Sequence, residues 1–329
     1  MEIETNHIIV IAEHSQGNIQ SITFELIHAA QILQQYAQCP IHIIVIDNEP
    51  EPMANELARM TGYSVFAVQI PGLENYNSES YKHALELIFM ELKPIYVCIA
   101  ATSQGNDFAP GLAIKMDAAC IPGIIQIQGR EGQACFTRLT QGCKIAEHYV
   151  SESDITILTI QPGSFKSDFK ENTSLGIVEK RKIVYQPKQS FSKGIKHVDV
   201  DTSSLTDAKV IISTGRGIQK KENLDYIFRL AKIFHHASIA CSRPICDAGW
   251  LPYSYQIGAT GTTVKPKLYL ACGISGASQH IQGIMGSDFI VAINSDKNAA
   301  IFNIADICIV EDMMSFIDVL IDEYQKFSV

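Results

Sequence analysis

Short apolar runs alternate with helix-like segments through the first third of the chain. Runs of this kind, bounded by polar residues, are typical of strands that are buried on both faces. The predicted strands are HIIVIA at 7–12, IHIIVID at 41–47, SVFAVQI at 64–70 and IYVCIAA at 95–101. The predicted helices between them span 23–37, 53–60 and 80–92. This alternation predicts a mainly parallel sheet with helices against its faces.

The pattern changes after a helix predicted at 110–116. Strand-like runs follow without a helix between them, at 123–128, 134–139, 144–150 and 155–160. We interpret them as an antiparallel extension of the first sheet. Further on, KQSFSKGIKHVDVDTSSLTD at 188–207 is polar and shows neither a strand nor a helix period, which indicates a linker. The predicted domains are therefore residues 1–187 and 208–329.

The alternation of strand and helix restarts in the second half. The predicted strands are KVIIS at 209–213, ASIAC at 237–241, KLYLA at 267–271, DFIVAIN at 288–294 and DICIVED at 306–312. Helices are predicted at 222–235, in a segment that ends near Met285, and at the C-terminus, where Met313, Ile317 and Leu320 lie on one stripe. The predicted fold class is α/β, with two domains that each contain a mainly parallel sheet flanked by helices.

Composition narrows the classes of function. The formal net charge is -9, and the short basic run Lys180–Lys182 follows Glu179, so the clustered cations of a nucleic-acid site are absent from the sequence. Nine cysteines occur without a CxxC pair, which argues against zinc and iron–sulfur sites and indicates buried thiols in a reducing compartment. No apolar run approaches the about 20 residues of a membrane helix, and the N-terminus lacks a basic signal-peptide region. The predicted location is cytoplasmic.

Polar and glycine-rich segments follow the strands of the second half. They are STGRG, CSRPICDAG, CGISGASQH, INSD and VED. Because the carboxyl ends of parallel strands lie along one edge of a sheet, we expect these segments to form one ligand site. Arg216 and Arg243, together with two predicted helix N-termini, favour a ligand that carries phosphate groups. The alternative for the two arginines is surface ion pairing.

The common nucleotide and nucleophile motifs do not occur in these segments. GRGIQK lacks the third glycine of a dinucleotide fingerprint, and GxxxxGK[ST] is absent. No glycine stands two residues after Ser275, so GISGAS is not a nucleophile elbow. A triad of Ser275, His280 and Asp312 is disfavoured, because a serine near a helix start usually serves as a cap. Turn and helix capping is likewise the alternative for Asn294 and Asp312.

The order of the motifs resembles the electron transfer flavoprotein alpha subunit family, which is also called the FixB family. LACGISGASQHIQGI followed by IVAINSD is similar to the long signature of that family. The flanking motifs STGRG, SRPICDAGW, IGATGTTVKPKLY and ADICIVED match in order, and the first half adds IVIAEH and AATSQGNDFAPGLA. The resemblance implies a Rossmann-like FAD-binding domain at 208–329 and a first domain that docks a beta subunit.

The same resemblance implies a function in electron transfer. The heterodimer of alpha and beta subunits would take electrons from flavin dehydrogenases, such as acyl-CoA dehydrogenases, and pass them to a downstream acceptor. It would act as a simple carrier or within an electron-bifurcating complex, with no catalytic residue and no metal in this chain. The segment 100–110 resembles a second nucleotide site, but in this family AMP or a second FAD belongs to the beta subunit. We therefore favour an interface or structural role for Gly105–Asp107.

The resemblance also assigns FAD contacts residue by residue. Arg216 would face the pyrophosphate, and Ser242 and Arg243 would lie beside the isoalloxazine. The Thr260 hydroxyl would lie near flavin N5, and His280 would point at the C2 carbonyl. Asn294, with Asp312 and Met313, would reach the ribose and adenine. The remaining implied contacts are Ile257, Gly258 and Ala259 around the ring, and Ser275, Gly276, Ala277, Ser278 and Gln279 around the flavin and ribityl chain.

Two points qualify these contacts. The family commonly has glutamine where this chain has Ala259, so one side-chain contact to the flavin loop is missing or replaced. One-electron reduction places negative charge near flavin N1 and the C2 carbonyl, so a cationic or hydrogen-bonding His280 and a nearby Arg243 would stabilise the reduced form. A charged hydrogen bond at His280 corresponds to roughly 60 to 130 mV of potential.

Two other classes of function stay open. The first is a NAD-dependent oxidoreductase or a deacylase on a related nucleotide-binding fold. The sequence lacks an acidic residue about 20 positions after a GxGxxG motif, which argues against a nicotinamide site. The second is a regulatory nucleotide-binding module without a redox role. A bound flavin distinguishes the electron carrier from both.

Overall fold

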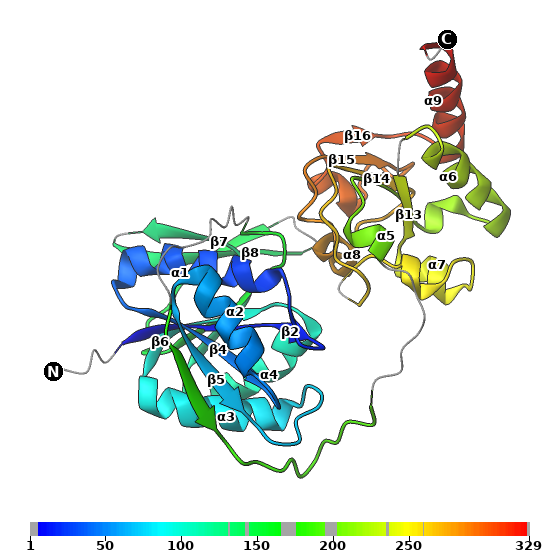
Figure 1. Ribbon diagram of the computed structural model, residues 1–329. Coiled ribbons are helices and arrows are strands. Elements are labelled where there is room, and N and C mark those ends of the chain that lie inside the picture. The colour runs from blue at the N-terminus through cyan, green and yellow to red at the C-terminus, as the bar shows by residue number, and fades with distance from the viewer. Residues whose placement is uncertain are drawn as a thin grey trace. The chain divides into compact units, whose positions relative to one another are not determined.

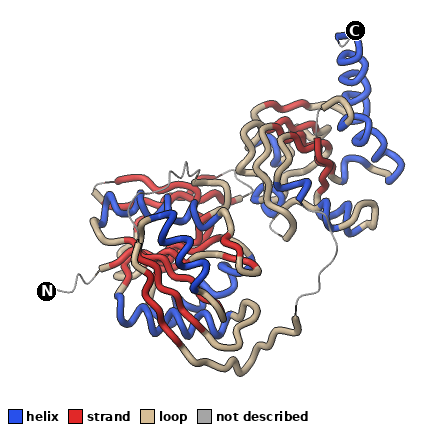
Figure 2. Tube along the Cα trace, viewed as in Figure 1, coloured by secondary structure: helices blue, strands red, loops and turns tan. Residues whose placement is uncertain are grey.

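The computed structural model describes residues 6–130, 132–141, 145–165, 176–194, 203–234, 237–258 and 260–327. The chain divides into two compact units. The first consists of residues 1–138 and 147–196, and the second of residues 139–146 and 197–329. In each unit a layer of strands lies between helices (Figures 1 and 2).

A nine-stranded sheet forms the centre of the first unit, in the order β11-β5-β4-β1-β6-β10-β7-β8-β9. Neighbouring strands from β11 to β7 pair in parallel, whereas β7 and β8 are antiparallel. The strands are β1 (His7–Ile11), β4 (Ile41–Asp47), β5 (Ser64–Gln69), β6 (Pro94–Ala100), β7 (Ala119–Arg130), β8 (Gln133–Thr140), β9 (Ile145–Val150), β10 (Thr156–Ile160) and β11 (Val178–Lys182). A small separate hairpin pairs β2 (His14–Ser15) with β3 (Asn18–Ile19).

Helices cover both faces of this sheet. Helices α1 (Ile22–Ala37) and α2 (Glu51–Thr61) share one hydrophobic cluster with Ile8 and Val10 of β1. Helices α3 (Ser78–Leu92) and α4 (Ser103–Met116) share the other cluster with Ile9 and Ile11. Successive side chains of β1 therefore enter opposite cores, which explains its uninterrupted apolar sequence. The predicted parallel arrangement of the first four long strands is confirmed.

Strand β10 corrects the prediction of a purely antiparallel extension. It pairs in parallel with β6 on one side and with β7 on the other. The antiparallel interpretation is right for β7 and β8, but it is wrong for β10, which returns to the middle of the sheet. All five residues of β10 are buried, as expected for a central strand.

The basic segment at 180–182 lies in a strand that the apolar pattern does not predict. Strand β11 is an edge strand, and its sequence VEKRK is polar. Arg181 pairs there with Glu91 and Glu179, at N–O distances of 3.0 and 3.2 Å. A charged edge strand satisfies its backbone on one side only and discourages pairing with other chains.

Helix α4 begins at Ser103, seven residues before the predicted start at 110. The Thr102 hydroxyl accepts a hydrogen bond from the Gly105 N–H, so TSQGND is a capped first turn rather than a loop. Within that turn the Asp107 carboxylate accepts a hydrogen bond from the Tyr76 hydroxyl at 2.8 Å. Asp107 therefore has a structural partner inside the first unit.

The start of the predicted linker is anchored to the first unit. The Glu79 carboxylate, at the beginning of α3, accepts hydrogen bonds from the N–H groups of Lys188, Gln189 and Ser190 at 2.7 to 2.9 Å. These bonds lower the pKa of Glu79 to about 2. Residues 195–202 of the predicted linker lie outside the described residues, and a short helix, α5 (Ser203–Thr206), follows them.

The second unit contains a five-stranded parallel sheet in the order β13-β12-β14-β15-β16. Helices α6 (Leu224–Ala231) and α9 (Met313–Phe327) pack on one face, and α5 packs on the opposite face. Helix α8 (Ser278–Gln282) lies on the same face as α5, where its His280 contacts Tyr269. The helix predicted to end near Met285 ends at Gln282. The strands are β12 (Val210–Thr214), β13 (Ala237–Cys241), β14 (Leu268–Cys272), β15 (Ile290–Ile293) and β16 (Ile307–Ile309).

The strand order of the second unit creates a crevice at one edge of the sheet. After β12 the chain forms β13 on one side of β12 and then crosses to form β14 on the other side. The connections that follow β12 and β14 therefore lead to opposite faces of the sheet and leave a gap between them. Ligands of open α/β sheets bind at this switch point, at the carboxyl ends of the strands.

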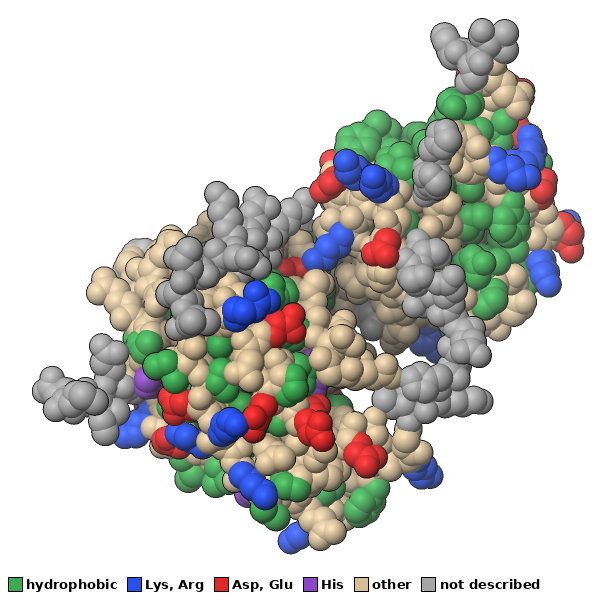
Figure 3. All heavy atoms as spheres, in the orientation of Figure 1, with side chains coloured by type: hydrophobic (Ala, Val, Ile, Leu, Met, Phe, Trp, Pro, Cys, Tyr) green, Lys and Arg blue, Asp and Glu red, His purple; other side chains and the backbone are tan. Residues whose placement is uncertain are grey.

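Charge is distributed over both units without a large basic area in the visible face (Figure 3). Acidic and basic side chains are interspersed there. In the part of the chain that the structure describes, no helix has the length and apolar character needed to cross a bilayer.

Candidate functional site

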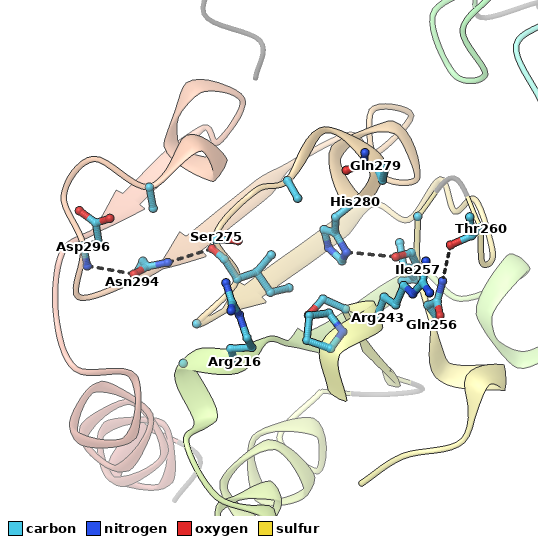
Figure 4. Close-up of a pocket in the computed structure, with 18 residues that line it drawn as sticks. Arg216, Arg243, Gln256, Ile257, Thr260, Ser275, Gln279, His280, Asn294 and Asp296 are labelled. Atoms are coloured by element: carbon cyan, nitrogen blue, oxygen red, sulfur yellow. Dashed lines mark hydrogen bonds between the residues drawn. The ribbon is translucent and has the colours of Figure 1, made fainter. Parts of the chain in front are cut away.

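A cavity of about 600 Å³ lies at the carboxyl edge of the second sheet. Its wall combines residues that follow β12, β13, β14 and β15 (Figure 4). The lining residues are Arg216, Gly217, Ser242, Arg243, Pro244, Gln256, Ile257, Gly258, Thr260, Gly273, Ile274, Ser275, Ala277, Gln279, His280, Asn294, Asp296 and Ala299.

Most of the residues assigned to FAD from the sequence lie in this wall. They are Arg216, Ser242, Arg243, Ile257, Gly258, Thr260, Ser275, Ala277, Gln279, His280 and Asn294. Segments separated by up to about eighty residues in the sequence thus meet at one crevice. Seven further lining residues have no assigned role from the sequence: Gly217, Pro244, Gln256, Gly273, Ile274, Asp296 and Ala299.

Four of the assigned residues, Gly276, Ser278, Asp312 and Met313, are not among those that line the cavity. Asp312 accepts a hydrogen bond from the Ser315 N–H at 3.0 Å at the start of α9, so the capping alternative applies to it. Met313, the first residue of α9, is buried in the core. Gly276 packs against the backbone of Ile301. The exposed Ser278 hydroxyl donates a hydrogen bond to the Gln279 side chain. Ala259 lies outside the described residues.

The floor of the cavity is built from closely packed backbone. A Cβ atom at Gly217 would lie 2.6 Å from the Gly273 Cα, and a Cβ at Gly273 would lie 2.7 Å from the Met313 sulfur. Gly273 also has a φ of 63°, in the left-handed region that favours glycine. The chain after β12 and the chain after β14 therefore meet as bare peptide groups.

Two arginines give the cavity its positive charge. Arg216 follows β12 and Arg243 begins α7 (Arg243–Asp247). The Arg243 Nε lies 3.3 Å from the Asp247 carboxylate in an exposed pair, whereas Arg216 makes no ion pair within the described ranges. Guanidinium groups bind phosphate oxygens with two parallel hydrogen bonds. This pair of side chains fits a ligand with a pyrophosphate group.

A buried glutamine orients the threonine at one end of the cavity. The Gln256 side-chain amide donates to the Thr260 hydroxyl oxygen at 2.9 Å, and Gln256 is 3% exposed (Figure 4). Because the hydroxyl accepts this bond, its own hydrogen stays available for an acceptor on a ligand. The only feature of the sequence that could have predicted a role for Gln256 is its position directly before the glycine-containing segment IGATG.

The opposite end of the cavity is held by Asn294. Its amide donates to the Ile274 carbonyl at 2.9 Å, and its carbonyl oxygen accepts the Asp296 N–H at 2.9 Å. Asn294 thus braces the chain after β14 against the chain after β15. Figure 4 shows Asn294 and Asp296 at one end of the site, with Gln256, Ile257 and Thr260 at the other.

His280 is buried, and both of its ring nitrogens have protein partners. Nδ1 lies 3.1 Å from the Ile257 carbonyl oxygen, and Nε2 lies 2.9 Å from the Tyr269 hydroxyl. Burial lowers the pKa of His280 to about 4, so the ring is neutral near pH 7. This environment does not fit the cationic role expected for His280, and both ring nitrogens already have protein partners, so no ring N–H is left for a direct hydrogen bond to a ligand.

The triad of Ser275, His280 and Asp312 is not assembled. His280 forms its hydrogen bonds with Ile257 and Tyr269, whereas Asp312 caps α9. Over the described ranges, no group of three or more histidine, cysteine or acidic side chains is arranged to bind a metal ion. The charged and polar groups that line the crevice therefore suit it to binding a ligand.

A crevice of this kind, at the switch point of a parallel sheet and flanked by two arginines, defines an α/β domain that binds a phosphate-bearing cofactor. Residues 204–285 match the family model of the electron transfer flavoprotein FAD-binding domain. Residues 8–201 match the model of the electron transfer flavoprotein domain. The chain belongs to the electron transfer flavoprotein family, and the second unit carries the FAD-binding domain of that family. The predicted family, fold class and cofactor are confirmed.

Named relatives span nearly the whole chain. The electron transfer flavoprotein subunit alpha of Bacillus subtilis is 30% identical over 322 residues, which cover 98% of each chain. The subunit of the same name from Syntrophomonas wolfei is 32% identical and covers 96% of this chain and 98% of its own length. The LctC subunit of a lactate dehydrogenase (NAD(+),ferredoxin) from Acetobacterium woodii is 32% identical, over 95% of this chain and 76% of its own length.

Proposed function

We propose that this chain is the alpha subunit of an electron transfer flavoprotein, which binds FAD in the cavity of its second unit and works as a heterodimer with a beta subunit. The observation that carries the proposal is the convergence of Arg216, Arg243, Thr260, His280 and Asn294 on the crevice at the switch point, within the family's FAD-binding domain. FAD supplies the one- and two-electron redox chemistry when it is bound. The protein residues bind and orient it.

The two ends of the cavity suit the two ends of FAD. The loop that contains Thr260 and the buried His280 suit an isoalloxazine ring, because they offer a hydroxyl donor and backbone groups beside apolar Ile257. Asn294 and Asp296 suit the ribose and adenine, which present hydroxyl groups and ring nitrogens. Arg216 binds the pyrophosphate between them, and Arg243 with Ser242 lies beside the ring.

The flavin accepts electrons from a flavin dehydrogenase and delivers them to a downstream acceptor. Acyl-CoA dehydrogenases are the proposed donors. We also propose that the first unit docks the beta subunit, and that the protein acts in the cytoplasm, where its free cysteines stay reduced. On this view the chain is an electron carrier rather than an enzyme in its own right.

A bifurcating complex is the second candidate within the same family. The similarity to LctC, a subunit of a lactate dehydrogenase that uses NAD and ferredoxin, favours it. In that case the chain would serve as one subunit of an oxidoreductase complex. The alpha subunit's site is the same in both cases, because the two candidates differ in the partner chains.

The test is a visible absorption spectrum of the chain purified with its beta subunit. We expect one tightly bound FAD for the site described here, and reduction of that flavin when an acyl-CoA dehydrogenase and its substrate are added. Arg243→Ala should weaken FAD binding or lower the flavin potential. A preparation that stays colourless after reconstitution with excess FAD would contradict the proposal, and binding of NAD instead would favour a nicotinamide-dependent enzyme.

A further inference from the structure

Tyr269 is buried in the sheet beneath the FAD site and does not line the cavity. It lies on β14, its exposed fraction is 0%, and its ring belongs to the core cluster that also contains Ile257 and Ile284. Its hydroxyl lies 2.9 Å from Nε2 of His280. The hydroxyl therefore reaches the site only through the histidine.

The partners of His280 determine where the imidazole proton sits. A backbone carbonyl can only accept a hydrogen bond, so Nδ1 must carry the proton that faces Ile257. A neutral ring then has Nε2 as an acceptor, and the Tyr269 hydroxyl donates to it. Burial raises the pKa of Tyr269 far above its ordinary value, so this hydroxyl stays protonated and stays a donor.

The histidine connects two backbone segments that are already in close contact. A Cβ atom at Gly258 would lie 2.7 Å from the Gln279 carbonyl oxygen, and a Cβ at Gly283 would lie 2.6 Å from the Gly258 nitrogen. Helix α8 and the loop at 256–258 thus pack backbone to backbone. A change in the orientation of the His280 ring would move the Ile257 carbonyl, and with it a wall of the cavity.

We propose that Tyr269 is a positioning residue for the FAD site: its hydroxyl fixes the Nδ1–H tautomer of His280, which in turn holds the Ile257–Gly258 backbone in place. The inference rests on the proposed FAD site and adds a residue that the cavity wall itself does not reveal. In this arrangement His280 acts on the flavin mainly through the loop it supports. Its own ring nitrogens are occupied by Tyr269 and Ile257.

The test compares Tyr269→Phe with Tyr226→Phe in the full chain purified with its beta subunit. The first variant removes the hydroxyl at His280, and the second removes a tyrosine hydroxyl on α6, across the sheet in the other core cluster. Loss of one buried hydrogen bond should raise the FAD dissociation constant of Tyr269→Phe by about 3- to 10-fold. Tyr226→Phe should keep the parent value.

Nitrogen NMR of histidine-labelled protein gives a second readout, which loss of packing alone would not change. The parent protein should show His280 as the neutral Nδ1–H tautomer near pH 7. In Tyr269→Phe the Nε2 resonance should shift, because it has lost its donor, and the pKa of His280 should rise. His280→Asn keeps a side-chain N–H near the Nδ1 position, so it should bind FAD better than His280→Ala.

The outcomes separate this inference from the proposed function. Parent FAD affinity and an unchanged His280 signal in Tyr269→Phe would overturn the positioning role while leaving the FAD site intact. If Tyr269→Phe does not fold, an Nε2–H or charged His280 in the parent protein would overturn it equally. A parent protein with the expected tautomer but no affinity for FAD would instead refute the proposed function.

Discussion

The side-chain amide of Gln256 donates a hydrogen bond to the hydroxyl oxygen of Thr260, four residues further along the chain. The donor is buried and the acceptor is exposed at the cavity, so the buried residue sets the orientation of the exposed one. The threonine is thereby prepared to donate outward before any ligand arrives. Preorganisation of this kind reduces the entropy that binding must otherwise overcome.

Gln256→Glu should therefore weaken FAD binding by about 2- to 10-fold and lower the flavin potential. The carboxylate has nearly the same shape as the amide, but it accepts a hydrogen bond, so the Thr260 hydrogen would turn away from the ligand. Titration of FAD and a redox titration measure the two effects. In a Thr260→Ala background the substitution should lose the part of its effect that depends on the hydroxyl, and full additivity would argue against this coupling.

His280→Ala should lower the flavin potential by less than about 65 mV, the contribution of one neutral hydrogen bond, because both ring nitrogens bond to protein groups and the ring acts through the Ile257–Gly258 backbone that it supports. This range is smaller than the estimate from the sequence, because that estimate assumed a charged donor and the buried ring is neutral near pH 7. A redox titration of the parent and the variant decides between the two. A decrease above about 100 mV would indicate that the histidine becomes charged when the cofactor is present.

Arg216→Ala should raise the FAD dissociation constant by about 10-fold, near the lower end for a charged hydrogen bond because the side chain is exposed. The effect should shrink as the salt concentration rises. Arg229→Ala is the matched control, because Arg229 pairs with Asp318 at 3.0 Å and does not line the cavity. Equal losses of affinity in the two variants would show that Arg216 acts through general charge rather than contact.

The stability of the protein should fall as the pH drops from about 6.5 to about 4, partly because of His42. Burial, together with the neighbouring His7, lowers the pKa of His42 to about 4 in the folded chain. The unfolded chain keeps the ordinary value of 6.5, so over this range it binds more protons than the folded chain and gains stability relative to it. The contribution is about 1 to 2 kcal/mol after allowing for partial exposure.

Urea unfolding at pH 7 and pH 5 measures this effect. His42→Gln should lose less free energy of unfolding between the two pH values than the parent protein does. His83→Gln serves as the control, because His83 lies on α3 and stacks on Tyr185 near the surface. If both variants keep the full pH dependence of the parent, His42 is not its source.

The strands of the first sheet could be predicted because both of their faces are buried. In β1 every residue from Ile8 to Ile11 enters one of two cores, so the run of apolar residues is long and unbroken. Strand β11 has charged residues at an edge, and α4 opens with a polar capped turn. Strand β11 depends on its pairing with β5, which is distant in sequence, and the first turn of α4 lacks the apolar positions on which the helix prediction relied.

The cavity could be predicted in outline because its motifs follow the strands that build it. The hydrogen bonds that position the lining residues could not be predicted, because they join residues that are distant in sequence. His280 meets Tyr269 eleven positions away and Ile257 twenty-three positions away. The resemblance implies ligand contacts for Asp312 and Met313, and in the structure the Asp312 carboxylate accepts the Ser315 N–H at the start of α9 while Met313 packs in the core.

The glycine-built floor beneath the site has a consequence for how such a protein can change. Where Gly217 and Gly273 touch, only peptide groups are available to a ligand, and any added side chain would collide with the opposing chain. In the proposed FAD site, substitutions can therefore change the charges and hydrogen bonds at the rim of the cavity while the backbone floor keeps its shape. Binding of the cofactor and adjustment of its redox potential would thus depend on different parts of the site. Evolution could then change the side chains at the rim while it preserves the glycines of the floor.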